Sequence, residues 1–347
     1  MVIPSNRREK IFLKDDYIRD LEGIIYLVIL NSHPPESIVA IPKYVPKQGG
    51  KWRGTYRRLF RNYTSSEFHK VSRSPIFRRY EFYSNSFGKK LLAIPNNLIA
   101  QHFVPENKLK ELMLSPRKEL GSLERNAIDL AKIFSEFGIK QNYMGITGSL
   151  LYNLHMPFSN LSIILYGLKG VVTFLHSIDE IVTENDHINF KSQFLDLGDK
   201  QIELGSRIRT FLWMNDVSTA IHVNEFPDFH FIYGSELARS LGKCEIIGSI
   251  HNVYEGFIRK NYVFRLTEVI NRLNAEEKLP ESLRLRIFSG RSEDIIFKEG
   301  ELVRASGVLQ WVESIESRQE KPFFQLSVGL EEFPGYACPL SILPKEI

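Results

Sequence analysis

The sequence predicts an α+β protein with three regions in order: a β-rich N-terminal region, an α/β middle region and a C-terminal region of short strands. Two observations support this. Runs of β-branched residues bounded by turn formers occur at both ends of the chain, and helical periodicity occurs between them. A chain of 347 residues is long enough for two or three domains. We place the boundaries at 1–112, 113–242 and 243–347.

In the N-terminal region, three segments have the composition of strands: Ile11–Leu13, Gly23–Leu30 and Ile38–Val45. Pro42 lies inside the third segment and cannot donate a hydrogen bond to a neighbouring strand. That segment is therefore expected to be an edge strand or to contain a bulge. A glycine-rich loop follows from Pro46, and it leads into a further strand or a short helix that ends near Tyr63.

Two amphipathic helices are expected near the start of the middle region: Asn107–Met113, which spans the boundary, and Ser122–Phe137, for which Ser122 is the expected N-cap. The stretch Met144–Gly167 (MGITGSLLYNLHMPFSNLSIILYG) then contains two short strands that are expected to lie side by side. A further helix is expected at Val171–Val182. Strand segments are expected after it, the last of them at Phe229–Tyr233.

The C-terminal region contains five or six short alternating segments separated by turn signals, which is typical of a small barrel or a curled sheet. One analogy is an OB-like barrel, a fold that binds single strands or oligosaccharides. The other interpretation is a structural or dimerising β-domain, because fold alone does not fix function.

Positive charge is concentrated in the N-terminal region. Between Lys43 and Lys90 there are 13 Lys or Arg and two acidic residues, a local charge of +11 in a chain whose net charge is +4. Cations and aromatics alternate here, which suits phosphates and unpaired bases. The alternative is a solvated face whose aromatic side chains point into the core. The residues that we expect to bind nucleic acid are Lys51, Trp52, Arg53, Tyr56, Arg57, Arg58, Arg61, Arg78 and Arg79.

Gly148 and Ser149 fall where the first strand of the middle stretch is expected to pass into a helix. The free amides and dipole of a helix N-terminus can hold an anion such as a phosphate, so these two residues are the expected nucleotide-binding residues. Gly-Ser at such a junction is also common for turn geometry alone.

Three separated segments carry a resemblance to a known family: HPPESIVAIPKYVP (His33–Pro46), the Gly148-Ser149 stretch, and IFSGRSEDIIFKEGELVRASGVLQWV (Ile287–Val312). Together they resemble the archaeal family of predicted nucleotidyltransferases, whose fold is polymerase-β-like. The resemblance implies that "Gly-Ser" is followed about ten residues later by a strand beginning Asp-x-Asp. It also implies a third carboxylate on a later strand, for which Glu225 and Asp228 are the candidates by position.

The corresponding pair in this chain is Asn160 and Ser162. In such enzymes the two aspartates hold magnesium ions that bridge the nucleotide phosphates. An amide and a hydroxyl supply oxygen but no charge, so affinity for magnesium should be severely reduced. We therefore expect a degenerate member with no confident catalytic or metal-binding residue and no cofactor, Mg²⁺ being needed only if the protein is active.

Three functions remain open at this point. The preferred one is a non-catalytic protein that binds nucleic acid, RNA in particular, and that can belong to a ribosome or another nucleoprotein assembly. The second is an active magnesium-dependent nucleotidyltransferase acting on RNA, protein or a small-molecule hydroxyl. The third is a scaffold that binds protein. The acids available to the second are Asp179, Asp186, Glu225 and Asp228.

Two features bear on the compartment. Cys244 and Cys338 have no metal-ligand spacing and are expected to be buried thiols of a cytoplasmic protein. The first residues lack the apolar core of a signal peptide, and no run of about 18 apolar residues occurs, so no membrane span is expected.

Overall fold

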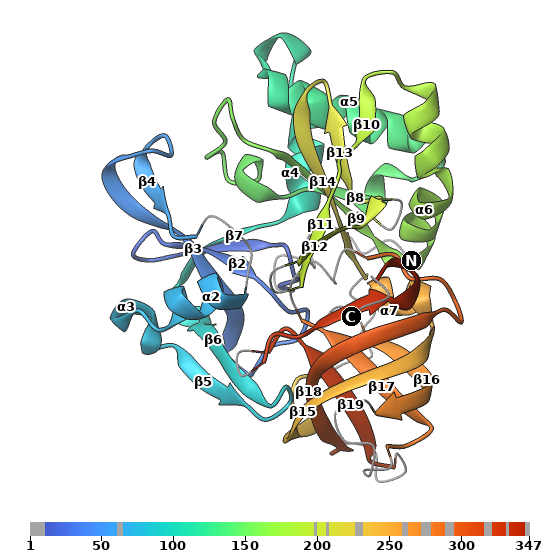
Figure 1. Ribbon diagram of the computed structural model, residues 1–347. Coiled ribbons are helices and arrows are strands. Elements are labelled where there is room, and N and C mark those ends of the chain that lie inside the picture. The colour runs from blue at the N-terminus through green and yellow to red at the C-terminus, as the bar shows by residue number, and fades with distance from the viewer. Residues whose placement is uncertain are drawn as a thin grey trace.

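A computed structural model describes residues 11–60, 65–197, 200–205, 208–225, 232–258, 263–271, 279–288, 295–315, 321–330 and 333–343. Within these residues the protein is a mixed α/β structure rich in strands and poor in helices (Figure 1). A seven-stranded sheet, a five-stranded sheet and a six-stranded sheet follow one another along the chain, with one separate two-stranded hairpin. Residues 229–231, most of the last strand expected in the middle region, lie outside the described residues.

The N-terminal sheet has the order β5-β6-β3-β2-β1-β7, and β4 pairs with β3. Two short helices, α2 and α3, lie between β4 and β5. The bounds are β1 Tyr17–Asp20, β2 Ile25–Val28, β3 Ser37–Gly50, β4 Gly54–Arg58, α2 Ser65–Ser72, α3 Pro75–Arg78, β5 Glu81–Ser84, β6 Lys89–Pro95 and β7 Ile99–Phe103.

Strand β3 is central rather than an edge, so this part of the prediction for Pro42 is wrong. The bulge is confirmed: Tyr26 of β2 pairs with Pro42, whereas the preceding Ile25 pairs with Tyr44, which leaves Lys43 as the extra residue. A bulge interrupts the ladder where a proline has no N–H to donate. The chain can therefore carry Pro42 in a strand that pairs with β2, β4 and β6.

The segment Ile11–Leu13 is not a strand, contrary to expectation. Leu13 is fully buried against Ile164 and Tyr166 of the middle sheet, with Ile11 beside them. The apolar residues of Ile11–Leu13 therefore pack against the face of the middle sheet and do not pair with a strand of the N-terminal sheet.

The middle sheet has the order β10-β13-β14-β9-β8, in which β9 and β14 are parallel and the other pairs antiparallel. A separate hairpin, β11–β12, follows β10. The bounds are α4 Pro105–Leu114, α5 Ser122–Glu136, β8 Met144–Ile146, β9 Leu161–Tyr166, α6 Gly167–Glu184, β10 Ile188–Phe190, β11 Phe194–Leu197, β12 Lys200–Glu203, β13 Phe211–Met214 and β14 Val217–Asn224.

Helices α5 and α6 pack on one face of this sheet. Phe134 of α5 and Phe174 of α6 are fully buried, with ring centroids 5.5 Å apart, and join the apolar core of β8, β9 and β14. The N-cap of α5 is Gly121 rather than Ser122, because the helix begins at Ser122 and the Gly121 backbone is extended. The Glu124 carboxylate accepts a hydrogen bond from the Gly121 amide at 2.7 Å. Glu124 lies three residues after Gly121, so its carboxylate can reach back to the amide of the N-cap residue.

The C-terminal sheet closes on itself. Its order is β15-β16-β17-β19-β18-β20, and β15 also pairs with β18, so five strands form a closed circuit with β20 beside β18. The bounds are β15 Glu236–His251, α7 Val253–Ile258, β16 Val263–Asn271, β17 Ser282–Ile287, β18 Leu302–Ser314, β19 Phe323–Val328 and β20 Tyr336–Pro339. Strand β15 runs through residue 243, so the change of fold comes earlier than the sequence boundary. Cys244 and Cys338 are free and buried, as expected.

The N-terminal sheet is joined to the closed sheet by the turn between β5 and β6. The Asn85 carbonyl accepts a hydrogen bond from the Ala238 amide at 2.8 Å, and the Phe87 carbonyl accepts one from Gln310 Nε2 at 3.2 Å. Gly88 has φ +60°, and a Cβ there would lie 2.7 Å from Gln310 Nε2. Only glycine permits this approach. In the part of the chain that the structure describes, no helix is long and apolar enough to cross a membrane.

Candidate functional site

The stretch expected to hold a nucleotide lies at the edge of the middle sheet, where β8 passes toward β9. The Thr147 amide donates to the Ser162 carbonyl at 3.0 Å. Gly148 has φ +70°, and a Cβ there would lie 3.2 Å from Ser162 Oγ. The structure thus brings Gly148 against Ser162, and Ser149, the next residue, is half-buried.

No α-helix begins at Gly148. Gly148–Leu150 forms a single 3-10 turn, η4, and Asn153 with φ +59° turns the chain away. Leu150 is buried in the middle core, whereas Leu151 and Tyr152 are buried against the N-terminal sheet. These neighbouring side chains pack into two cores, which fixes the segment as a turn between them. A three-residue turn has almost no macrodipole, so the helix N-terminus expected to hold an anion is absent at this position.

The positions of the lost aspartates supply no carboxylate. Asn160 is exposed just before β9, and Ser162 is half-buried within it. On the neighbouring parallel strand β14, Ala220 pairs with Ser162. The sequence of β14, VSTAIHVN, contains no acid.

The acids considered as replacements lie elsewhere. Glu225 follows Asn224, which pairs with Tyr166 at the other end of β9 from Ser162. Asp179 is paired with Arg209 at 3.0 Å, and Asp186 is exposed beyond the end of α6. Asp228 lies outside the described residues. Among the residues that are described, no group of three or more His, Cys, Asp or Glu could hold a metal ion. The donors near Gly148 therefore do not fit Mg²⁺.

The sheet face that carries Ser162 is partly covered by the N-terminal segment, which the sequence did not predict. Thr147 Oγ1 donates to the Asp15 carbonyl at 2.6 Å, and the Asp15 carboxylate lies 3.3 Å from His222 Nδ1. Asn224 Nδ2 donates to the Lys14 carbonyl at 3.0 Å. Asp15 itself has φ +71°, unusual for a residue other than glycine. No local sequence pattern indicates this contact, because it joins segments far apart in the chain and uses the backbone carbonyl of Asp15.

One cation of the basic region is internal. Lys43 is 4% exposed at the bulge of β3, and its ammonium donates to the Tyr17 hydroxyl. Burial, with a smaller effect of the Arg58 charge, holds the pKa of Lys43 well below its usual value. Lys43 therefore belongs to the core of the N-terminal sheet rather than to a polyanion-binding surface.

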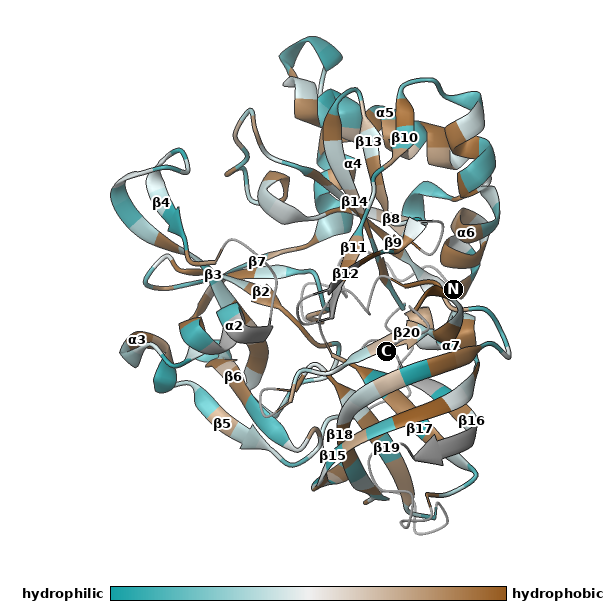
Figure 2. Cartoon of the chain, in the orientation of Figure 1, coloured by the Kyte–Doolittle hydropathy of each residue, from teal (hydrophilic) through white to brown (hydrophobic). Residues whose placement is uncertain are grey.

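The β3–β4 hairpin presents the other cations to solvent. Lys51, Arg53 and Arg57 are exposed, whereas Arg58 is half-buried. Figure 1 shows this hairpin projecting from the N-terminal sheet, and Figure 2 shows hydrophilic residues along β4. The hairpin thus carries the exposed charge predicted for this region.

The two aromatics of the hairpin are half-buried and hold it in place. Trp52 makes edge contacts with Tyr44 and with Phe158, each at 5.4 Å between ring centroids. The Tyr56 hydroxyl donates to the Gly23 carbonyl at 3.1 Å. The core interpretation of these aromatics therefore applies in part, and their contact with nucleic acid stays a prediction.

Arg78 and Arg79 lie at the end of α3 and are exposed. Arg79 is paired with Glu22 at 2.9 Å and lies over the Tyr80 ring at 4.8 Å. Its charge is partly neutralised, so the hairpin is the stronger part of the predicted interface. Arg61 lies outside the described residues.

Comparison with known proteins adds one distant relative. Over 161 residues the chain is 26% identical to the uncharacterized protein MJ1086 of Methanocaldococcus jannaschii, an alignment that covers 44% of this chain and 46% of that protein. The chain thus spans less than half the length of the curated relative it matches. No family model matches the sequence. No solved structure matches it either.

Proposed function

We propose that this protein binds nucleic acid, with RNA preferred, through the exposed β3–β4 hairpin, on a polymerase-β-like scaffold that has lost its metal-dependent chemistry. The observation that carries the proposal is the exposure of Lys51, Arg53 and Arg57 on one projecting hairpin. Guanidinium and ammonium groups that contact solvent rather than carboxylates are available to neutralise phosphates.

The loss of chemistry is supported by the surroundings of Gly148. Its neighbour Ser162 and the facing Ala220 supply no charged oxygen for magnesium. Phosphoryl transfer depends on metal ions that neutralise developing charge on the phosphates. A site without carboxylates lacks that part of the mechanism.

The order of the closed sheet is compatible with the same proposal. The order β15-β16-β17-β19-β18-β15, with β17 and β19 parallel, is that of a five-stranded Greek-key barrel of the OB type. In this chain Gln310, Gln325 and Ser327 of its outer surface are buried, and Gln310 bonds to Phe87 of the N-terminal sheet. We therefore assign nucleic-acid contact to the hairpin and a packing role to this part of the barrel.

The test is the affinity for single-stranded RNA of a hairpin triple variant, K51Q/R53Q/R57Q. Loss of three phosphate contacts should weaken binding at least about thirtyfold at low salt, because binding without base readout depends mainly on counterion release. Filter binding or fluorescence anisotropy measures this affinity. A loss below about threefold would contradict the proposal.

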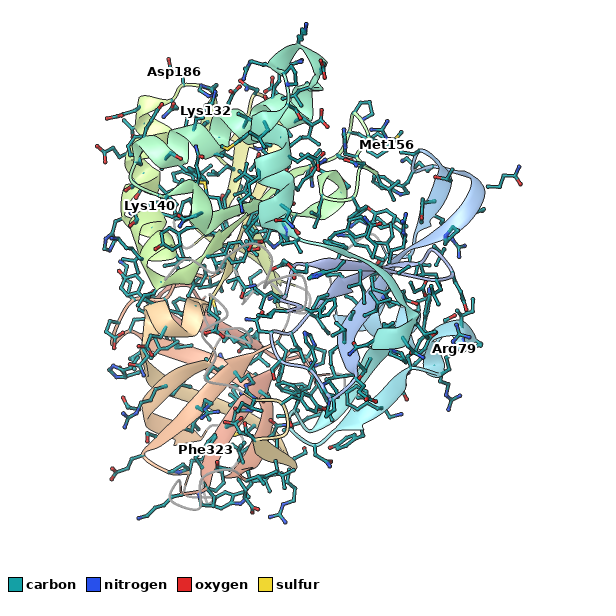
Figure 3. The ribbon with its side chains drawn as sticks, turned by 180° about the vertical axis from the view of Figure 1, so that it is seen from behind. Arg79, Lys132, Lys140, Met156, Asp186 and Phe323 are labelled. Carbon is teal, nitrogen blue, oxygen red and sulfur yellow. The ribbon has the colours of Figure 1, made fainter. Side chains whose placement is uncertain are left out.

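The matched control removes the same charge elsewhere. Lys132, Lys140 and Lys169 are exposed on the middle region, and Figure 3 shows Lys132 and Lys140 on the opposite side of the molecule from the hairpin. The control triple variant K132Q/K140Q/K169Q should bind RNA within about threefold of wild type. An equal loss in both variants would mean that net charge, not the hairpin, determines binding.

An active nucleotidyltransferase is the second candidate function, favoured by one observation. Gly148 lies against Ser162, one of the two positions at which the family resemblance implies a metal-binding aspartate. Calorimetric titration of the protein with Mg²⁺ and each nucleoside triphosphate separates the two functions. Micromolar, metal-dependent binding would favour the enzyme. Binding of neither RNA nor triphosphate would favour a scaffold that binds protein.

A further inference from the structure

The tip of the hairpin contacts a turn of the middle region that lies between η4 and β9. Phe158, on this turn, lies with its ring 4.7 Å from the Lys51 ammonium and 5.4 Å from the Trp52 ring. The Arg53 guanidinium lies 3.5 Å from His155 Nε2. Figure 3 shows the same proximity, with Met156 of this turn beside the hairpin. Two segments about a hundred residues apart in the sequence thus form one surface.

Phe158 is held in place without being buried. Its turn is closed by reciprocal hydrogen bonds, from the Met156 amide to Ser159 Oγ at 2.9 Å and from the Ser159 amide to the Met156 carbonyl at 2.8 Å. Pro157 precedes it and restricts the backbone. Yet Phe158 remains 54% exposed. A large aromatic side chain that is ordered and still more than half exposed gains little from burial, and it needs little further ordering to bind a flat ligand.

The charges around the ring favour an anionic ligand. Lys51 lies over the ring, Arg53 contacts His155 of the same turn, and both cations are exposed. Burial, with a smaller effect of the Arg53 charge, lowers the pKa of His155. His155 is therefore uncharged at neutral pH, and the positive charge of this surface comes from Lys51 and Arg53. A ligand with a flat apolar face and a neighbouring anion fits this surface, and a nucleotide within a single strand has both.

We propose that Phe158, which contacts Lys51 and Trp52, is a stacking platform for one unpaired base of single-stranded RNA. Lys51 and Arg53 contact the adjacent phosphates. This inference rests on the proposed function and gives it a substrate class: unpaired strands rather than duplexes, whose bases are already stacked on each other.

The test compares Phe158→Leu with Phe158→Tyr. Leucine keeps apolar contact with Trp52 but removes the aromatic face, whereas tyrosine keeps it. One lost stacked base should weaken binding of an oligouridylate about tenfold in the leucine variant. The tyrosine variant should remain within twofold of wild type. Binding of heparin, which has charge but no bases, should not change in either.

Trp52 gives a second readout. The chain contains three tryptophans, Trp52, Trp213 and Trp311. In a W213F/W311F background the emission reports Trp52 alone, and a base stacked on Phe158 should quench it. Quenching by oligouridylate but not by heparin, lost in Phe158→Leu, is the expected result.

Two results would overturn the inference: unchanged oligouridylate affinity in Phe158→Leu, or an equal loss for oligouridylate and heparin, which would mean that the substitution only displaces the hairpin. These outcomes do not contradict the proposed function if the hairpin triple variant still shows reduced affinity for RNA. If the triple variant binds RNA as tightly as wild type, the proposed function itself is contradicted.

Discussion

The Gly148 junction and the β3–β4 hairpin differ in what surrounds their polar groups. At the junction, Thr147 donates to Asp15, Asp15 meets His222, and Gly148 packs against Ser162. On the hairpin, the cations of Lys51 and Arg53 reach solvent beside an exposed ring. The polar groups of the junction are engaged in packing contacts, whereas the cations of the hairpin are exposed to solvent. Substitutions at the junction should therefore change stability, and substitutions on the hairpin should change binding.

The largest effect on stability is expected at the centre of the middle sheet. Ile163 of β9 is fully buried between β8 and β14. Replacing it with alanine leaves a cavity and should lower the free energy of unfolding by about 3 kcal/mol, measured by urea denaturation. RNA affinity, measured where the variant is folded, should stay within twofold. A tenfold loss of affinity would break the distinction between the two regions.

A pH effect is expected from His33, which fastens the N-terminal segment. Its Nε2–H donates to the Phe12 carbonyl at 2.9 Å, and its Nδ1 accepts from the Val39 amide at 3.1 Å, so the folded protein holds the neutral ring. Burial lowers the pKa of His33 to about 4. The unfolded chain takes up the proton near pH 6.5, before the folded protein does.

Stability from His33 is therefore complete above about pH 6.5 and is lost as the pH falls toward 4, by about 3 kcal/mol in total. Denaturation at several pH values measures this. In His33→Gln the protein should be less stable at pH 7 and its stability should vary less between pH 6.5 and 4. An unchanged pH profile in the variant would assign the titration to other groups.

A smaller effect is expected from Gly148→Ala. The left-handed backbone disfavours any side chain, and the new methyl would lie 3.2 Å from Ser162 Oγ. The free energy of unfolding should fall by about 1–2 kcal/mol. RNA affinity should not change. Loss of RNA binding without loss of stability would instead identify Gly148 as a ligand contact.

Local patterns predicted much of the fold. The β-branched composition of Ile38–Val45 and the periodicity in Ser122–Phe137 correspond to β3 and α5, because β3 is buried along this segment and α5 buries one apolar face. The C-terminal segments likewise correspond to strands of the closed sheet. Pro42 predicted the bulge but not the central position of its strand, since pairing partners come from distant parts of the chain.

The site was less predictable because it depends on contacts between distant segments. Leu151 and Tyr152 are drawn into the N-terminal core, so the turn after Gly148 cannot extend into a helix. Two contacts illustrate this: Asp15 covers the middle sheet beside Thr147, and Lys51 contacts Phe158. Each joins residues more than a hundred positions apart. Neither has a signature in local sequence. The cations of the hairpin, by contrast, could be identified from composition alone.

The most direct measurement is the salt dependence of RNA affinity in the hairpin triple variant, the control triple variant and wild type, between about 50 and about 200 mM salt. Each phosphate contact on a single strand contributes about 0.7 to the slope of log affinity against log salt concentration, so removing three should reduce its magnitude by about 2. We expect that reduction in the hairpin triple variant only. Equal slopes in all three proteins would contradict the assignment of phosphate binding to the β3–β4 hairpin.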